Sequence, residues 1–141
     1  MKLATKETYA TLCIYSRSDA SIADTIRKSF SLEPSRLVVN NSPPRWLKRP
    51  RGMPVFKYAW FLSSKRQVRS RDVERHIQWL LDQLGEKFRG RSLERLGYVA
   101  KISCYWSSEG AGGGPVLSVA LLRRVASSEL PLEFDVYLVQ A

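Results

Sequence analysis

The sequence predicts an α+β fold, a ferredoxin-like sandwich with a largely antiparallel sheet and helices on one face. Five segments have strand character and alternate apolar with polar residues, which is typical of antiparallel strands that bury one face. Three amphipathic segments with helical spacing lie between them. The resulting order is β-α-β-β-α-β-α-β, so we expect a ferredoxin-like core with one additional αβ unit.

The first part of the chain supplies two of these strands and one helix. Residues 9–16, YATLCIYS, alternate with aliphatic side chains at the even positions and predict a strand. Residues 22–30 carry an apolar side chain at every fourth position and predict a helix. Ser21 and Asp24 have the spacing of a capping box at its start. A turn and a short strand are expected within residues 32–40.

A loop interrupts the chain before the third strand. Residues 41–54, NSPPRWLKRPRGMP, contain four prolines and a glycine, so they cannot form a regular element. Trp46 is the one aromatic anchor of this basic, proline-rich loop. Residues 55–64 return to strand character. The length of 141 residues fits one domain, and we expect a single domain over residues 1–141.

The second half contains the longest helix. Ser70 is expected to cap it, and its apolar positions run through residues 73–84. Residues 98–106, YVAKISCYW, predict a strand, and Ser118 is expected to cap a last helix before the closing strand LEFDVYLV. The side chains expected on the inner face of this last helix are Val119, Leu122, Val125 and Ala126, and those expected inward on the closing strand are Leu132, Phe134, Val136 and Leu138.

The positive charge is concentrated in one part of the chain. The formal net charge is +10, and residues 45–75 contain ten lysines and arginines but only two acidic residues. The remainder of the chain is nearly balanced. Such asymmetry indicates contact with something anionic: nucleic acid, a membrane surface or an acidic protein.

The location expected for the protein is the cytoplasm. No apolar run approaches the roughly 18 residues of a membrane span, and the start of the chain lacks the apolar core of a secretory signal. Cys13 and Cys104 each lie inside a strand-like run without C-x-x-C spacing. We expect two buried, reduced thiols, with a disulfide or redox pair as the alternative.

A glycine-rich segment, CYWSSEGAGGGPVLS, resembles a phosphate-binding loop in layout only. Pro115 and Val116 follow Gly114, so the lysine and hydroxyl of a P-loop are missing, and Pro115 stands where a dinucleotide fingerprint needs its third glycine. We interpret the segment as a connector, with anion binding at the helix start near Ser118 as the alternative. His76 is the only histidine, and we expect it to be partly buried at the surface. No catalytic residue, metal or cofactor is expected.

The outward face of the sheet is a second candidate surface. Glu133, Asp135 and Tyr137 alternate with the inward residues of the last strand. The side chains that neighbouring strands add to this face are Tyr9, Tyr15, Lys101, Ser103 and Tyr105. Together they predict an aromatic-rich platform, which resembles RNA-recognition modules except that their signature run is absent.

The chain also resembles a known family. The segments YATLCIY, SLEPSR, YAWFLSS, HIQWLLDQL, GYVAKISCYWSS and LSVALLRRVASSELPLEFDVY, in this order, are similar to a bacterial family designated domain of unknown function 4279. The similarity extends from Tyr9 to Tyr137. It implies a small α+β protein of bacterial type, and it implies no activity and no catalytic residues.

We therefore expect a non-enzymatic binding domain that contacts an acidic protein through its basic segment. The residues expected to make this contact are Arg45, Trp46, Lys48, Arg49, Arg51, Lys65, Arg66, Arg69 and Arg71. RNA or DNA binding is the alternative, and an enzyme acting through the outer sheet face is the third hypothesis. The oligomeric state is left open.

Overall fold

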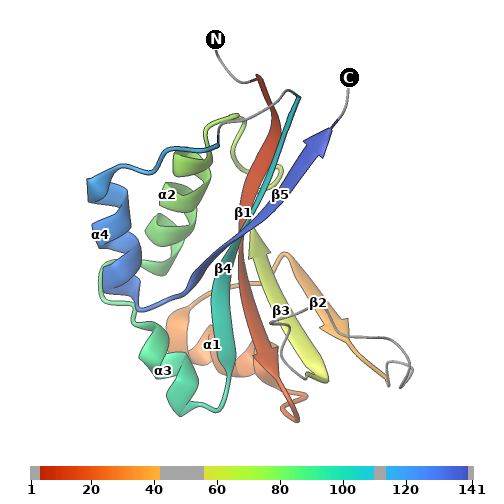
Figure 1. Ribbon diagram of the computed structural model, residues 1–141. Coiled ribbons are helices and arrows are strands. Elements are labelled where there is room, and N and C mark those ends of the chain that lie inside the picture. Colours follow the sequence, from red (N-terminus) through yellow and green to blue (C-terminus); the bar gives the residue numbers. More distant parts are fainter. Residues whose placement is uncertain (1–3, 42–55, 110–113, 140–141) are drawn as a thin grey trace.

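The computed structural model describes residues 4–41, 56–109 and 114–139 (Figure 1). It has a mixed α/β architecture with a five-stranded, mostly antiparallel sheet and four helices. The elements in chain order are β1 (Ala4–Ser16), α1 (Ile22–Phe30), β2 (Arg36–Val39), β3 (Tyr58–Ser63), α2 (Val73–Leu84), α3 (Gly90–Arg95), β4 (Val99–Glu109), α4 (Val119–Ser128) and β5 (Leu132–Val139).

The two longest strands, β1 and β4, pair antiparallel at the centre of the sheet, whose order is β2-β3-β1-β4-β5. Strand β3 pairs antiparallel with β1 and with β2. Strand β5 runs parallel to β4, and α4 supplies the crossover that parallel neighbours require. The sheet therefore has two edges among the described strands, β2 and β5.

All four helices lie on one side of the sheet, as the sequence predicts (Figure 1). The even positions of β1 face them, and Ala10, Leu12 and Ile14 are fully buried. Trp60 of β3 and Ile77 of α2 complete the centre of this core. Because strand side chains alternate, the odd positions of β1 point to the opposite face, which no described helix covers.

The helix starts differ in part from the expectation. Asp72, rather than Ser70, caps α2, because its carboxylate accepts the Glu74 N–H at 3.0 Å. Ser21 occupies the cap position of α1 but its side chain makes no capping hydrogen bond. The expected partner, Asp24, is 2.7 Å from Arg27 instead, so the predicted capping box does not form.

The inner faces of α4 and β5 also differ from the expectation. Helix α4 packs against α2 (Figure 1) and buries Leu121, Val125 and Ser128, so of the four side chains expected inside only Val125 is buried. On β5, Val136 is 51% and Leu138 is 63% exposed. Of the four residues expected inward on this strand, the two nearer its start, Leu132 and Phe134, are half-buried. The distal half of β5 therefore extends beyond the helix layer.

His76 is fully buried, at 2% exposure, and is not the surface residue expected. Its Nε2–H donates to the Ser70 carbonyl at 2.8 Å, so its Nδ1 accepts the Ser64 hydroxyl at 2.6 Å. The Ser64 oxygen in turn accepts the Ala10 N–H at 2.9 Å. This chain of hydrogen bonds joins α2 to β1 and to the segment after β3.

Replacing Ser64 with alanine tests this network. The substitution leaves the Ala10 N–H and His76 Nδ1 buried without partners, so we expect the free energy of unfolding to fall by about 2 kcal/mol or more. Urea unfolding followed by circular dichroism measures the loss. Ser127→Ala, at an exposed position of α4, is the control and should change stability by less than about 0.5 kcal/mol. Equal stability of the two variants would refute a structural role for the network.

Gly90, at the start of α3, provides a second test, because it lies against Glu129 at the end of α4. A Cβ atom at Gly90 would lie 2.4 Å from the Glu129 carbonyl oxygen. Gly90→Ala should therefore lower the free energy of unfolding by about 1–3 kcal/mol. Gly114→Ala is the matched control, since a Cβ there meets no atom within 4 Å. Thermal unfolding of both variants gives the comparison, and an unchanged midpoint for Gly90→Ala would contradict the contact.

Candidate functional site

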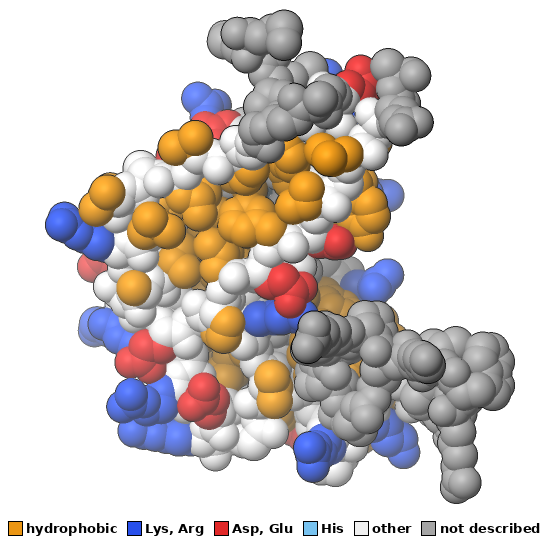
Figure 2. All heavy atoms as spheres, in the orientation of Figure 1, with side chains coloured by type: hydrophobic (Ala, Val, Ile, Leu, Met, Phe, Trp, Pro, Cys, Tyr) orange, Lys and Arg blue, Asp and Glu red, His pale blue; other side chains and the backbone are white. Residues whose placement is uncertain are grey.

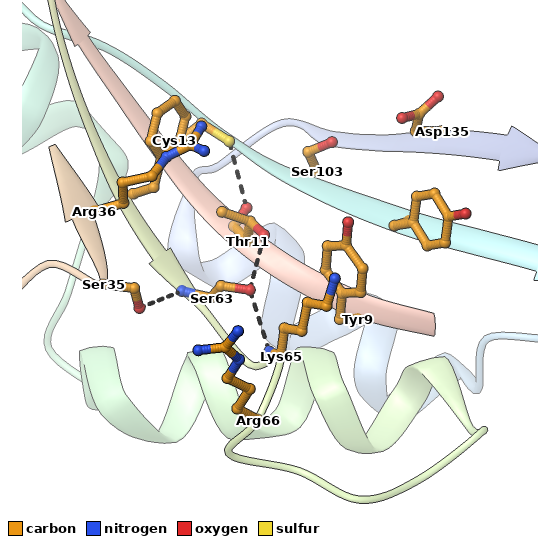
Figure 3. A pocket seen from close by; sticks show the side chains of 12 residues that line it. Tyr9, Thr11, Cys13, Ser35, Arg36, Ser63, Lys65, Arg66, Ser103 and Asp135 are labelled. Carbon is orange, nitrogen blue, oxygen red and sulfur yellow. Dashed lines mark hydrogen bonds between the residues drawn. The ribbon is translucent and has the colours of Figure 1, made fainter. Parts of the chain in front are cut away.

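The uncovered face of the sheet carries an open hollow of about 530 Å³ (Figure 3). All five strands and the segment after β3 contribute side chains to it. The polar and aromatic residues that define it are Tyr9, Thr11, Ser63, Lys65, Arg66 and Tyr105. The hollow is therefore a concave surface lined by polar and aromatic side chains.

A ladder of three tyrosines crosses this face, one from each of β1, β4 and β5. Tyr9 lies opposite Tyr105 in the register, and their rings stack with centroids 4.9 Å apart and 10° between the planes. Tyr105 and Tyr137 follow with centroids 5.2 Å apart at 30°. The expected aromatic platform thus brings these three residues together. Tyr15 lies further along β1, in a separate cluster with Phe56.

The rings of the ladder cover one another. Lys65 reaches Tyr9 from the β3 side, with its Nζ 5.0 Å from the ring centroid. Tyr9 is therefore held between Lys65 and Tyr105, and Tyr105 between Tyr9 and Tyr137. The ladder presents ring edges and hydroxyl groups to the hollow, so the flat faces of its two inner rings are not available for stacking.

The charges on this face are polarised. Arg36, on β2, stacks on Phe61 with 5.2 Å between its guanidinium carbon and the ring centroid. Lys65 and Arg66 lie on the same side of the hollow, and Asp135 of β5 lies on the opposite side (Figure 3). Lys65 also approaches Glu7 at 3.6 Å. The β2–β3 side of the hollow is therefore cationic and the β5 side acidic.

The acidic side chains near β5 already have partners. Glu133 forms a 2.8 Å ion pair with Lys101. A hydrogen bond to Asp135 raises the pKa of the Tyr137 hydroxyl. The two carboxylates therefore take part in neighbouring contacts on the face, rather than converging on one point as an acid–base pair would.

Burial raises the pKa of one tyrosine and of both cysteines in the central strands. Burial, followed by the nearby Glu7 carboxylate, raises the pKa of Tyr9. Burial raises the pKa of Cys13 to about 11 and that of Cys104 to about 12. Cys13 faces the hollow, whereas Cys104 belongs to the core on the helix side, so the two thiols lie on opposite faces of the sheet. Neither thiol has the low pKa of a nucleophile.

The structure brings two of the nine expected contact residues to the hollow. Lys65 and Arg66 line it, and Arg66 sits at φ 73° in the turn that follows β3. Arg69 and Arg71 are exposed between β3 and α2 and do not line it. The other five, Arg45, Trp46, Lys48, Arg49 and Arg51, lie outside the described residues.

Sequence reasoning missed Arg36. It is the first residue of a four-residue strand, where no local pattern distinguishes it from other surface arginines. Only the pairing of Arg36 with Phe61 places it at the rim of the hollow. The sequence does place Arg36 two residues before Val38, and alternate residues of one strand share a face. This spacing could have assigned Arg36 to the same face as Val38.

The glycine-rich segment offers less than a phosphate loop would. Residues 110–113 lie outside the described residues. At the start of α4, the Ser118 hydroxyl accepts the Leu121 N–H at 3.2 Å, as expected of a cap. The Ser118 N–H itself donates to the Glu74 carboxylate. A carboxylate therefore already occupies the helix start that was considered for anion binding.

Two further features concern the described residues as a whole. No three side chains of histidine, cysteine, aspartate or glutamate gather into a group that could hold a metal ion within residues 4–41, 56–109 and 114–139. In the same ranges, every helix is too short or too polar to cross a membrane.

The thiols give a pH-dependent prediction. Iodoacetamide at pH 7.5 should label Cys13 and Cys104 at least about tenfold more slowly in the native protein than in urea, because only the thiolate reacts and both groups are buried. Both pKa values are raised on folding from an ordinary value of 9.0, so the folded state should lose stability as the pH rises from about 9 to about 12. Mass spectrometry and unfolding curves measure the two effects. Rapid native labelling of Cys13 at pH 7.5 would contradict this account.

Comparison with known proteins gives one match. No curated protein and no solved structure matches the chain. The family model described as "Domain of unknown function (DUF4279)" matches residues 6–139, which span all five strands except the first two residues of β1, and all four helices. Because this match covers nearly the whole length, the protein belongs to the DUF4279 family.

Proposed function

We propose that the protein is a non-enzymatic binding domain whose open sheet face contacts an acidic protein. The observation that carries this proposal is the pair of arginines at the rim of the hollow. Within the described ranges, no carboxylate lies within 4.0 Å of the guanidinium of Arg36 or Arg66. An arginine fork without an internal partner is suited to bind a carboxylate of another molecule through two hydrogen bonds.

The hydroxyl groups of the face support a polar partner. Tyr9, Thr11, Ser63 and Ser103 line the hollow beside the cations. Each hydroxyl can donate to or accept from the backbone and side chains of a peptide. The basic segment 45–75 that the sequence singles out would extend the same contact, with Lys65 and Arg66 as its members on the hollow.

The charge distribution favours a protein over a nucleic acid. A nucleic acid carries negative charge along its whole length, so a strand crossing the sheet would meet the acidic β5 side after the cations. A peptide can place its carboxylates beside Arg36 and Arg66 and other groups beside Asp135. The ring faces of Tyr9 and Tyr105 are covered, which removes two of the stacking surfaces that single-stranded RNA would use.

Nucleic-acid binding remains the second candidate because of one observation. Tyr137 ends the ladder and is 49% exposed, so the outer face of its ring is open to a stacked base. The net charge of +10 would attract any polyanion. The experiment below separates the two partners.

We also infer a ferredoxin-like arrangement and a cytoplasmic location. The order β2-β3-β1-β4, with antiparallel neighbours throughout, supports the first, and β5 with α4 is then the additional αβ unit. Two free, buried thiols on opposite faces support the second.

The double variant Arg36→Gln/Arg66→Gln tests the proposed function. We expect it to weaken binding of fluorescently labelled poly-L-glutamate by at least about tenfold, because each charge-assisted contact contributes about 1.5 kcal/mol. Fluorescence anisotropy at a series of salt concentrations measures the affinity. The matched control is Lys28→Gln/Arg95→Gln, which removes the same charge from exposed positions of α1 and α3 and should change the affinity less than about threefold.

The same titration with a single-stranded oligonucleotide of equal charge is the comparison. Preferential, saturable binding of the oligonucleotide, with a further loss in Tyr137→Ala, would favour the nucleic-acid function. An equal effect of the two double variants on poly-L-glutamate would show that only net charge matters, and the proposed face would then be rejected.

A further inference from the structure

Strand β5 presents an unpaired backbone edge. The Ile102 N–H donates to the Pro131 carbonyl at 2.8 Å, and Ile102 lies opposite Leu132 in the parallel register. In such a ladder the odd positions of β5 direct their N–H and C=O groups to β4, and the even positions direct theirs outward. The residues with outward groups are Leu132, Phe134, Val136 and Leu138. No other described strand lies beside them.

Apolar side chains are exposed along the same edge. Val136 and Leu138, on the helix side, lie beyond the helix layer and are more than half exposed. Figure 2 shows hydrophobic side chains gathered between α2, α4 and β5 on this side of the molecule. The whole strand, LEFDVYLV, contains no proline or lysine, two of the residues that natural proteins use to keep edge strands apart, and its only charged side chains are Glu133 and Asp135 on the open face. The edge therefore has both the hydrogen-bonding groups and the apolar surface of a strand that is meant to pair.

We propose that β5 pairs antiparallel with β5 of a second copy of this chain, about a twofold axis at Val136. The axis runs perpendicular to the sheet. The two five-stranded sheets therefore join into a single ten-stranded sheet, with the helices of both copies on the same face. The inference is independent of the partner proposed above, because the pairing uses the edge of the sheet and leaves the cationic side of the hollow uncovered.

The acidic residues exclude the other extensive registers. Centring the pair on Asp135 sets the two copies of Asp135 opposite each other. Centring it on Phe134 sets Glu133 opposite Asp135 twice. Like charges directly opposite one another in a sheet are destabilising. Centring it beyond Val136, toward the end of β5, shortens the ladder.

The register centred on Val136 is complementary on both faces. On the open face it sets Asp135 opposite Tyr137 of the second copy, where the phenol can donate to the carboxylate. On the helix side it sets Phe134 opposite Leu138 and Val136 opposite itself, so the exposed aliphatic side chains cover one another. Strand β5 carries two acidic residues and no basic one, so no lysine or arginine of β5 lies opposite another across the axis.

The other edge strand supplies a matched control. Leu37 of β2 is 50% exposed, against 51% for Val136, and the register with Trp60 puts it on the same side of the sheet. Val136→Lys sets two lysines opposite each other at the axis, so we expect sedimentation velocity to give the mass of one chain. The unchanged protein and Leu37→Lys should both give the mass of two, with circular dichroism showing that each variant is folded.

Cysteine cross-linking tests the register itself. Residues opposite one another in a hydrogen-bonded pair have Cα atoms about 5.5 Å apart, within the span of a disulfide. Val136→Cys should therefore form a disulfide-linked dimer under mild oxidation. Leu138→Cys should do so at least about tenfold more slowly, because its neighbour is Phe134. The native thiols are buried and do not compete.

Three outcomes would overturn the proposal. The first is the mass of a single chain for the unchanged protein at about 100 μM or above. The second is loss of association in Leu37→Lys, which would indicate that β5 pairs with β2 instead. The third is faster cross-linking of Leu138→Cys than of Val136→Cys. None of them bears on the binding of poly-L-glutamate, so the two proposals fail separately.

Discussion

The antiparallel pairing of β1 with β4 is the constraint on which the rest of the structure depends. It sets Leu12 opposite Ile102 on the helix side, and Tyr9 opposite Tyr105 on the open side. Side chains alternate along each strand, so a slip of one residue would move the apolar set to solvent and the tyrosines into the core. The hydrophobic core thus holds the register that assembles the tyrosine ladder, and the candidate site needs no separate scaffold.

The parallel strand β5 explains the asymmetry of the molecule. A parallel neighbour of β4 requires a crossover, and α4 provides it while packing against α2. Because α4 buries its apolar side chains there, none of the described helices lies above the distal half of β5. Val136 and Leu138 are exposed for this reason, and β5 is an edge strand among the strands that the structure describes. The cationic rim of the hollow lies near the opposite edge of the sheet, at β2 and β3, so the two proposed surfaces are separate.

The chemistry of the open face follows from how its rings and charges are arranged. Rings that stack on one another offer edges and hydroxyl groups, which suits hydrogen bonding better than the insertion of a flat base. Among the described residues, no carboxylate lies within 4.0 Å of the guanidinium of Arg36 or Arg66, whereas Glu133 is paired with Lys101. The buried thiol of Cys13 stays protonated at neutral pH. These features together describe a polar and aromatic surface with separate positive and negative sides.

The sequence by itself determines the strands, three of the helices and the side of each strand that is apolar, because these follow from local periodicity. It also assigns Tyr9, Tyr105 and Tyr137 to the outward positions of their strands, since alternation needs no partner. Only the tertiary structure decided which strands are neighbours, and hence that Arg36 joins Lys65 at one rim. It also decided that His76 is buried against Ser64. Val136 is exposed, although it alternates with outward-facing residues in β5 just as the buried Ile102 does in β4. The physical reason is that burial and proximity depend on pairing between distant segments, which local spacing does not encode.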